Sequence, residues 1–278
     1  MLDYNKIAFN IRENLENYIR SNQIASLVIG VSGGIDSTLC CALARPVCEK
    51  TGINLIGVSL PIRTNQADEI QRAKDTGEAF CSFFREVLLE NMFVPWEEAE
   101  KDNSQNQNQR SYKIRTGNIK ARLRMIYLYD LARRNSGIVL STDNYTELVL
   151  GFWTLHGDVG DYGMIQNLWK TEVYELAEHL SESSEDGKVK SALNAAIQAV
   201  PTDGLGITDS DLDQLGLSTY KEVDETLQRY FNITNVHYDD VKKEMEDNPV
   251  ISRYLRTEFK RNNPYNIPRE NIIKGAQQ

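Results

Sequence analysis

The feature that most constrains the fold is a turn with two adjacent glycines, placed between a buried strand and a helix. Residues 27–31 form an apolar run of strand length, and residues 36–48 have the apolar spacing of a helix. The turn reads Gly-Val-Ser-Gly-Gly-Ile-Asp-Ser over residues 30–37. Paired glycines permit a tight turn and a close approach of the backbone to a ligand. The free amides at the helix start, with the helix dipole behind them, therefore predict an anion site.

The side chains of this turn indicate which anion it holds. The hydroxyl groups of Ser32 and Ser37 add donors that suit phosphate oxygens, but the lysine of a Walker A loop is missing. Asp36 is an acid inside a phosphate cradle, which a bridging Mg²⁺ ion would explain. The alternative is an ordinary glycine turn with Asp36 capping the helix, and it leaves both serines unexplained. The residues predicted to cradle phosphate are Gly30, Val31, Ser32, Gly33, Gly34, Ile35, Asp36 and Ser37.

Strands and helices alternate along the first half of the chain. Apolar runs predict strands over residues 27–31, 55–60, 86–89 and 137–140. Helical spacing covers residues 4–20, 36–48, 67–84 and 118–133, and polar stretches predict loops over residues 103–111, 181–188 and 207–216. The alternation predicts an α/β fold, a doubly wound parallel sheet with helices on both faces. The length of 278 residues suits a single domain spanning residues 1–278.

The overall charge and the cysteines argue against several classes of function. A net charge of −9 disfavours broad nucleic-acid binding, which needs a concentrated basic surface. No apolar run approaches the roughly 20 residues of a membrane span, so we expect no membrane insertion. Charged residues interrupt the N-terminal segment, which is unlike a secretory signal. The four cysteines lack paired spacing, which favours buried, reduced thiols and a cytoplasmic location.

The turn and several later segments also resemble a known family. Residues 32–37 resemble the pyrophosphate loop of the N-type ATP pyrophosphatases, which implies an adenine nucleotide alpha hydrolase-like fold and ATP as co-substrate. Further segments are similar, in order, to those of NAD synthetases: residues 60–69, 117–125, 141–147, 151–158, 201–202 and 258–261. Together they resemble the ammonia-dependent members of the NAD synthetase family.

This resemblance implies roles for individual residues. Beyond the turn, the implied ATP contacts are Thr142, Lys170 and Thr202, and the implied contacts with the dinucleotide substrate, deamido-NAD, are Arg122, Asp161, Phe259 and Lys260. Asp36 and Glu147 are expected to hold Mg²⁺. Glu147 also follows the fourth predicted strand, at the edge where open parallel sheets bind ligands. Helix capping is the alternative role for Thr142 and Glu147.

Asp158 completes the expected catalytic set of Asp36, Glu147, Asp158 and Lys170. A carboxylate beside an acyl-adenylate would favour ammonium and accept its proton, and a structural cap is the alternative role. Two positions depart from the family pattern. Leu155 stands where the family usually has a lysine that contacts the dinucleotide, and Phe259 stands where it has a histidine. The departures leave the ATP half of the expected site intact and alter the dinucleotide half.

The reaction implied by the resemblance is amidation of deamido-NAD to NAD through an adenylated intermediate. Glutamine-dependent relatives carry an additional glutaminase domain, for which this length leaves no room, so we expect ammonia as the nitrogen donor. A homodimer is implied, with residues 4–20 and 118–133 as candidates for its interface. One rival is another pyrophosphate-loop enzyme, tRNA-modifying or GMP-synthetase-like, which the acidic charge and later segments disfavour. The other is a catalytically silent nucleotide-binding module, which retention of Asp36, Glu147 and Lys170 disfavours.

Overall fold

A parallel β-sheet forms the centre of the protein. The computed structural model describes residues 2–62, 65–100, 108–200, 212, 215–233, 245 and 247–274. The strands are β1 (Ser26–Gly30), β2 (Asn54–Ser59), β3 (Phe83–Glu86), β4 (Gly137–Ser141) and β5 (Tyr162–Gly163). They are parallel and lie in the order β3-β2-β1-β4-β5. In the register of the central strand, Val28 lies between Ile56 of β2 and Val139 of β4.

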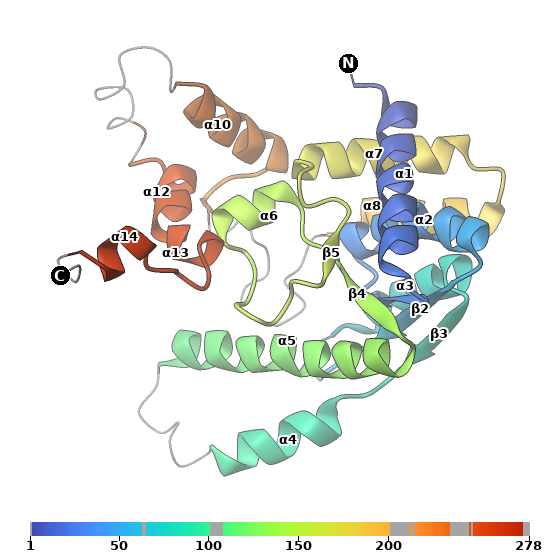
Figure 1. Ribbon diagram of the computed structural model, residues 1–278, viewed down its shortest axis with the longest axis horizontal. Helices are drawn as coiled ribbons and strands as arrows, with labels where there is room; N and C mark the ends of the chain where they lie inside the picture. Colours follow the sequence, from blue (N-terminus) through green and yellow to red (C-terminus); the bar gives the residue numbers. More distant parts are fainter. Residues whose placement is uncertain are drawn as a thin grey trace.

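Helices cover both faces of this sheet, which confirms the predicted α/β fold (Figure 1). The helices with described bounds are α1 (Tyr4–Asn22), α2 (Ile35–Thr51), α3 (Ala67–Phe80), α4 (Glu90–Ala99), α5 (Gln109–Arg134), α6 (Tyr145–Leu150), α7 (Lys170–Ser183), α8 (Gly187–Gln198), α10 (Tyr220–Asn232), α12 (Pro249–Arg256), α13 (Glu258–Arg261) and α14 (Arg269–Ile272). One face packs on α1, α2, α3, α7 and α8, and the opposite face packs on α4 and α5.

The alternation of side chains along the strands explains the two layers. Leu27 and Ile29 of β1 join the apolar cluster formed with α2 and α7, whereas Val28 joins the cluster beneath α5. The same alternation separates Val139 from Leu140 in β4. A strand buried on both faces reads as a continuous apolar run, which is why β1, β2 and β4 were predictable to within one or two residues.

The prediction of a strand over residues 86–89 is wrong, because β3 is Phe83–Glu86. This edge strand is largely exposed and lacks the burial pattern that marks the central strands. The apolar run after it serves a different purpose, since Leu89 is buried at the start of α4. The predicted loop over residues 103–111 also changes. The Asn108 side chain accepts a hydrogen bond from the Ser111 amide at 2.8 Å, so α5 begins at Gln109, and residues 103–107 lie outside the described part.

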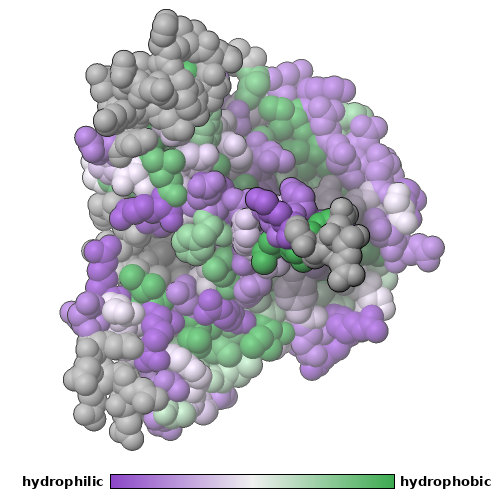
Figure 2. All heavy atoms as spheres, turned by 60° about the vertical axis from the view of Figure 1, so that its left-hand side comes forward, coloured by the Kyte–Doolittle hydropathy of each residue, from purple (hydrophilic) through white to green (hydrophobic). Residues whose placement is uncertain are grey.

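A separate apolar cluster lies beside the sheet, formed by α6, α10 and α12. In Figure 1 these helices, with α13 and α14, lie to the left of the sheet. Figure 2 brings this side forward, and hydrophobic patches are interspersed there with hydrophilic ones. Exposed apolar side chains in this part of the chain include Leu255, Phe259, Ile267 and Ile272. Within the described ranges no helix is both long enough and apolar enough to cross a membrane.

The strand order creates a crevice at the carboxyl edge of the sheet. The chain leaves β1 to add β2 and β3 on one side, and it later returns to add β4 and β5 on the other. The segments that follow β1 and β4 therefore diverge from neighbouring strands. In open parallel sheets this topological switch point is where ligands bind. The fold places both residues 31–37 and residues 142–147 there.

Candidate functional site

A direct hydrogen bond joins the two segments at the switch point. Asn144 Nδ2 donates to Asp36 Oδ1 at 2.9 Å, across 108 positions of sequence. The Asn144 side-chain oxygen also accepts from the Glu147 amide at 3.0 Å, so the same residue caps α6. Asn144 is fully buried. It therefore fixes the start of α6 relative to the start of α2, and with them the carboxylates of Asp36 and Glu147.

Gly33 sets the shape of the turn after β1. Its φ of +78° lies in the left-handed region, which favours glycine. A Cβ atom there would lie 2.6 Å from the Ala73 amide nitrogen and 2.7 Å from the Glu69 carbonyl oxygen. Glycine is therefore required here because the turn passes close to the backbone of α3. The turn is held against α3, and its opposite side remains open to a ligand.

The two serines of the turn have different environments. Ser37 is buried, and its hydroxyl donates to the Gly34 carbonyl at 3.1 Å and accepts from the Ser32 amide at 3.3 Å. Ser32 is exposed, and its hydroxyl lies 3.1 Å from that of Ser37 and 3.2 Å from the Gly34 amide. Ser37 therefore stabilises the turn from within, whereas the Ser32 hydroxyl, which accepts from the Gly34 amide, lies on the exposed side that lines the cavity.

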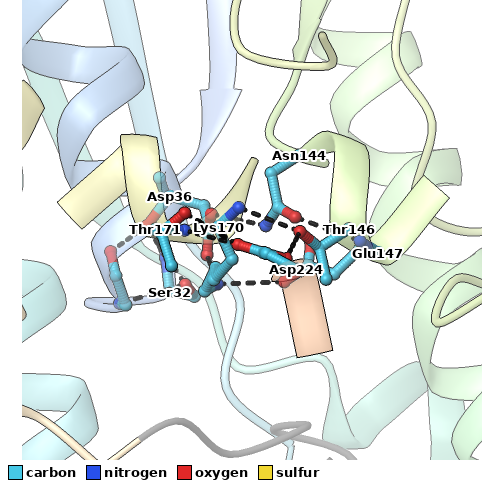
Figure 3. Close-up of polar contacts among 10 residues, drawn as sticks. Ser32, Asp36, Asn144, Thr146, Glu147, Lys170, Thr171 and Asp224 are labelled. Atoms are coloured by element: carbon cyan, nitrogen blue, oxygen red, sulfur yellow. Dashed lines mark hydrogen bonds and ion pairs between the residues drawn. The ribbon is translucent and has the colours of Figure 1, made fainter. Parts of the chain in front are cut away.

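A buried lysine joins the two predicted metal-binding carboxylates (Figure 3). The Lys170 ammonium lies 2.5 Å from Asp36 Oδ2 and 3.0 Å from Glu147 Oε1, and its side chain is 3% exposed. It projects from the first residue of α7, whose start is capped by Glu172 accepting from the Trp169 amide. Burial alone disfavours the ammonium, but Asp36 and Glu147 outweigh that effect and raise the pKa of Lys170. Burial likewise raises the pKa of Glu147, and Lys170 opposes the rise.

The cluster forms one wall of a cavity of about 280 Å³. Ten of the predicted site residues line it: Gly30, Val31, Ser32, Gly34, Ile35, Asp36, Thr142, Glu147, Asp158 and Lys170. The structure thus places Thr142, which follows β4, on the same cavity as the turn after β1. Thr202, the remaining predicted ATP contact, lies outside the described residues.

Asp158 lines this cavity and acts electrostatically on a second buried acid, Asp143. Asp158 Oδ2 accepts from the Thr154 amide at 2.5 Å, and burial raises the pKa of Asp158. Asp143 accepts from the Ser141 hydroxyl at 2.9 Å. Burial first, and the charge of Asp158 second, raise the pKa of Asp143 to about 7. Asp158 lines the cavity, and its charge acts on Asp143, so two buried acids influence each other's protonation beside the cavity.

Two of the predicted dinucleotide residues, Arg122 and Lys260, contact the backbone of residues 151–155 and do not line the cavity. Arg122 Nε donates to the Leu155 carbonyl at 3.1 Å. Lys260 Nζ donates to the carbonyl oxygens of Gly151, at 2.6 Å, and of Trp153. Burial, and Arg253 nearby, lower the pKa of Lys260. All these cationic groups contact the protein's own backbone.

The two other predicted dinucleotide residues, Asp161 and Phe259, differ in their environments. Asp161 Oδ2 accepts from the Val139 amide at 2.9 Å and Oδ1 accepts from the Tyr129 hydroxyl at 3.1 Å, so it fastens the segment to β4. Phe259 is 63% exposed. None of the four predicted dinucleotide residues is among the described residues that line the cavity.

Several residues of the site were not predicted. Arg124 lines the cavity and donates to the Leu60 carbonyl at 3.1 Å, although the sequence pattern singled out its neighbour Arg122. Arg72 also lines the cavity, and its Nε donates to the Gly33 carbonyl at 3.3 Å. Tyr220 faces the Lys170 ammonium, which lies 5.4 Å from the ring centroid. The signals available were the two-residue offset that turns Arg124 to a different side of α5 from Arg122, and the position of Asn144 inside a recognised motif.

Comparison with known proteins identifies the family. The sequence matches the family described as NAD synthase over residues 7–264. It is 32% identical over 268 residues to the NH₃-dependent NAD⁺ synthetase of Thermoplasma acidophilum, covering 96% of this chain and 99% of that protein. A solved structure of NMN synthetase from Francisella tularensis is 26% identical, with a TM-score of 0.75 over 97% of this chain and 100% of the other. An NH₃-dependent NAD synthetase from Campylobacter jejuni, 19% identical with a TM-score of 0.68 over 96% of this chain and 100% of the other, shares the fold. The chain therefore belongs to the NAD synthase family.

Proposed function

We propose that this carbon–nitrogen ligase amidates deamido-NAD to NAD with ammonia, and that it converts ATP to AMP and pyrophosphate. One observation carries the proposal. Lys170 joins Asp36 and Glu147 within 3.0 Å at the carboxyl edge of the sheet, beside the turn of residues 30–37, in a member of the NAD synthase family. Membership in this family disfavours a tRNA-modifying or GMP-synthetase-like activity.

The first step activates the substrate. The nicotinate carboxylate attacks the α-phosphorus of ATP, the bond to the bridging oxygen breaks, and pyrophosphate leaves onto the amides and the Ser32 hydroxyl of the turn. Lys170 places a positive charge beside the phosphates, and because it is already held in position, the protein does not have to rearrange during the step. The cavity position of Thr142 and Arg124 supports further contacts with the nucleotide.

We propose that Asp36 and Glu147 hold Mg²⁺. Their carboxylate oxygens already converge on one cation, the Lys170 ammonium, and Mg²⁺ in proteins is commonly bound by one or two carboxylates together with substrate phosphates and water. Among the described residues no group of three or more His, Cys, Asp or Glu side chains gathers as a metal site, so phosphate oxygens would complete the coordination. When bound, the ion neutralises charge that develops on the phosphate oxygens.

The second step uses ammonia. Ammonia attacks the acyl carbon of the adenylate, the bond to the AMP oxygen breaks, and the amide and AMP separate. Asp158 is proposed to hold the incoming ammonium and to take its proton. Its support is its cavity position together with a pKa raised by burial, which brings a carboxyl group closer to the range of a useful general base. The likeness to NH₃-dependent relatives supports ammonia as the nitrogen source.

A second candidate substrate is nicotinic acid mononucleotide. Two observations favour it. One is the likeness to an NMN synthetase, and the other is that Arg122 and Lys260 donate to backbone carbonyls of residues 151–155, not to an open ligand site. Leu155, in the same segment, offers no cation to a second phosphate group. The ratio of kcat/KM for deamido-NAD to that for the mononucleotide decides between the substrates. Leu155→Lys is expected to raise that ratio by about tenfold, the value of one exposed charge contact, and Leu155→Met to leave it unchanged.

We further propose that the protein is a cytoplasmic homodimer organised as a single domain. Free, buried Cys40, Cys41 and Cys48 support a reducing compartment. Ile126 and Tyr129 of α5 are exposed apolar side chains, 58% and 40% accessible, on a helix expected at the interface. Ile126→Glu is expected to convert the dimer to a monomer in sedimentation experiments, and a wild-type monomer would contradict the assignment.

The whole proposal is tested by one assay. The protein is incubated with ATP, Mg²⁺, ammonium chloride and deamido-NAD, and AMP and NAD are measured. Equal amounts of both are expected from the wild type and from Asp75→Ala, which alters an acid on the exposed side of α3. No turnover is expected from Asp36→Ala. A folded wild-type sample that forms neither product, with either nucleotide substrate, would contradict the proposed function.

A further inference from the structure

A buried carboxylate outside the cavity lies behind the catalytic cluster. Asp224 is on the second turn of α10 and is 1% exposed. It belongs to none of the motifs that carry the family resemblance. A carboxylate in such a position is stable only if hydrogen bonds replace its hydration, so its partners indicate what it does.

The partners of Asp224 come from the starts of two other helices (Figure 3). Asp224 Oδ1 accepts from the Thr146 hydroxyl of α6 at 2.5 Å. Asp224 Oδ2 accepts from both the backbone amide and the hydroxyl of Thr171 in α7, at 3.0 Å and 2.9 Å. The Thr146 hydroxyl in turn accepts from the Lys170 amide at 2.9 Å. One carboxylate thus holds the first turns of α6 and α7 together.

These two first turns carry the reactive side chains. Thr146 directly precedes Glu147, and Thr171 directly follows Lys170. The amides at both helix starts are free of intrahelical partners, and the positive ends of both dipoles favour a negative charge. The position of the Lys170 ammonium between Asp36 and Glu147 therefore depends on backbone atoms that Asp224 fixes.

We propose that Asp224 is a positioning residue for the reaction: it couples the docking of α10 to the alignment of Lys170 and Glu147 with Asp36. The inference rests on the proposed function, because it takes the alignment of Lys170 and Glu147 with Asp36 to be needed for ATP activation. Tyr220 supports the coupling, because it lies on the same helix, lines the cavity and faces the Lys170 ammonium. Displacement of α10 would therefore move one wall of the ATP cavity and both charged side chains together.

A purely structural role makes a different prediction. Val223, next to Asp224 on α10, is fully buried in the apolar cluster with Leu227, Val250 and Ile251. That cluster alone would dock α10 against α6 and α12 without hydrogen bonds. Val223→Ala removes packing from the same helix and lowers stability, but it leaves the Asp224 carboxylate and its three hydrogen bonds, which hold α10 in position, in place. It is therefore the matched control for a substitution of Asp224.

The test compares Asp224→Asn with Val223→Ala. The asparagine keeps the volume but turns an amide donor toward Thr146 or Thr171, so the two helix starts lose their common acceptor. We expect kcat for AMP formation to fall about 10- to 100-fold, as for small misplacements of catalytic groups, and the Kd for ATP with Mg²⁺ to rise. Val223→Ala should change both less than about threefold, with a similar or larger loss in Tm. Asp224→Asn with kcat and Kd no different from those of Val223→Ala would overturn the inference.

Two further arms keep the outcomes separable. Thr171→Val removes only one of the three hydrogen bonds to Asp224, so it is used where Asp224→Asn does not fold, and the same fall in kcat at a smaller size is expected. A wild type that binds ATP but forms no amide would contradict the proposed function. The effect of each variant on the Kd for ATP with Mg²⁺ would then still decide the positioning role: a rise confined to Asp224→Asn and Thr171→Val supports it, and equal values in all variants overturn it.

Discussion

Asn144 holds Asp36 through a 2.9 Å hydrogen bond while capping the helix that carries Glu147. This single side chain links the segment after β1 with the segment after β4. The two carboxylates of the site are therefore positioned by the topology of the sheet, because the neighbouring strands β1 and β4 form the switch point at their carboxyl ends. Lys170, brought in by α7, completes the arrangement.

Replacement of Asn144 should separate its two roles. Asn144→Ala removes a helix cap, which costs about 1 kcal/mol of the free energy of unfolding. It also frees Asp36 to move, so kcat should fall about 10- to 100-fold. Asn248→Ala is the matched control, since Asn248 caps α12 in the same way, accepting from the Val250 amide at 2.9 Å. The control should lose similar stability in urea unfolding and keep its kcat, and a normal kcat in Asn144→Ala would refute the positioning role.

Gly33 should be irreplaceable even by alanine. Gly33→Ala combines a left-handed backbone with overlap against the backbone of α3, where nothing can move cheaply. Gly52→Ala has a similar φ of +73° but open space around the added methyl group. We expect Gly52→Ala to cost about 1 kcal/mol and Gly33→Ala at least about 2 kcal/mol more, because overpacking adds to backbone strain. Equal midpoints of thermal unfolding for the two variants would contradict this account of the turn.

Lys170 should be needed both for chemistry and for neutralising its two acids. Lys170→Met leaves Asp36 and Glu147 close together without a neutralising cation, so AMP formation should fall about a thousandfold. Added Mg²⁺ should raise the Tm of this variant more than that of the wild type, where the ammonium already compensates the carboxylates. Lys50→Met is the control, because Lys50 is 66% exposed and pairs with Glu16 at the surface. Identical Mg²⁺ responses in all three proteins would show that Asp36 and Glu147 do not hold the ion.

Asp143 should make the protein less stable as the pH rises. Its pKa is raised from 3.8 to about 7 in the folded state, so between these values the folded protein binds more protons than the unfolded chain. Stability therefore decreases as the pH rises from about 4 to 7, and then levels off. Asp143→Asn keeps an acceptor for the Ser141 hydroxyl and cannot ionise. It should be more stable than the wild type at pH 8 and show a smaller pH dependence in chemical unfolding, whereas an unchanged slope would argue against a neutral Asp143.

The sequence was most informative where residues are buried on both sides or repeat a local motif. Strands β1, β2 and β4 are continuous apolar runs, and the turn of residues 30–37 has a chemistry that few alternatives explain. The edge strand β3 is largely exposed, and β5 has only two residues, so neither contains the run of buried apolar side chains that marks a central strand. The cap at Asn108 that begins α5 lay inside a polar run that resembles a loop.

Sequence motifs did not predict the contacts between segments that are far apart in the chain. The sequence indicated that Asp36, Glu147 and Lys170 belong to one site, but it did not indicate that the lysine sits between the two acids. Nor did it single out Asp224, whose partners are 78 and 53 positions away in the chain. The choice between Arg122 and Arg124 likewise depends on the rotation of α5 against β1 and β4, which packing alone decides.

The central claim is that the substrate carboxylate attacks the α-phosphorus of ATP at this site. Deamido-NAD labelled with ¹⁸O in its nicotinate carboxylate tests the claim most directly, because amidation of an acyl-adenylate transfers one carboxylate oxygen to AMP. Mass spectrometry of the AMP formed with ATP, Mg²⁺ and ammonium should find one ¹⁸O atom in its phosphate, with the second label retained in the amide. Unlabelled AMP, or ADP as the nucleotide product, would contradict the account.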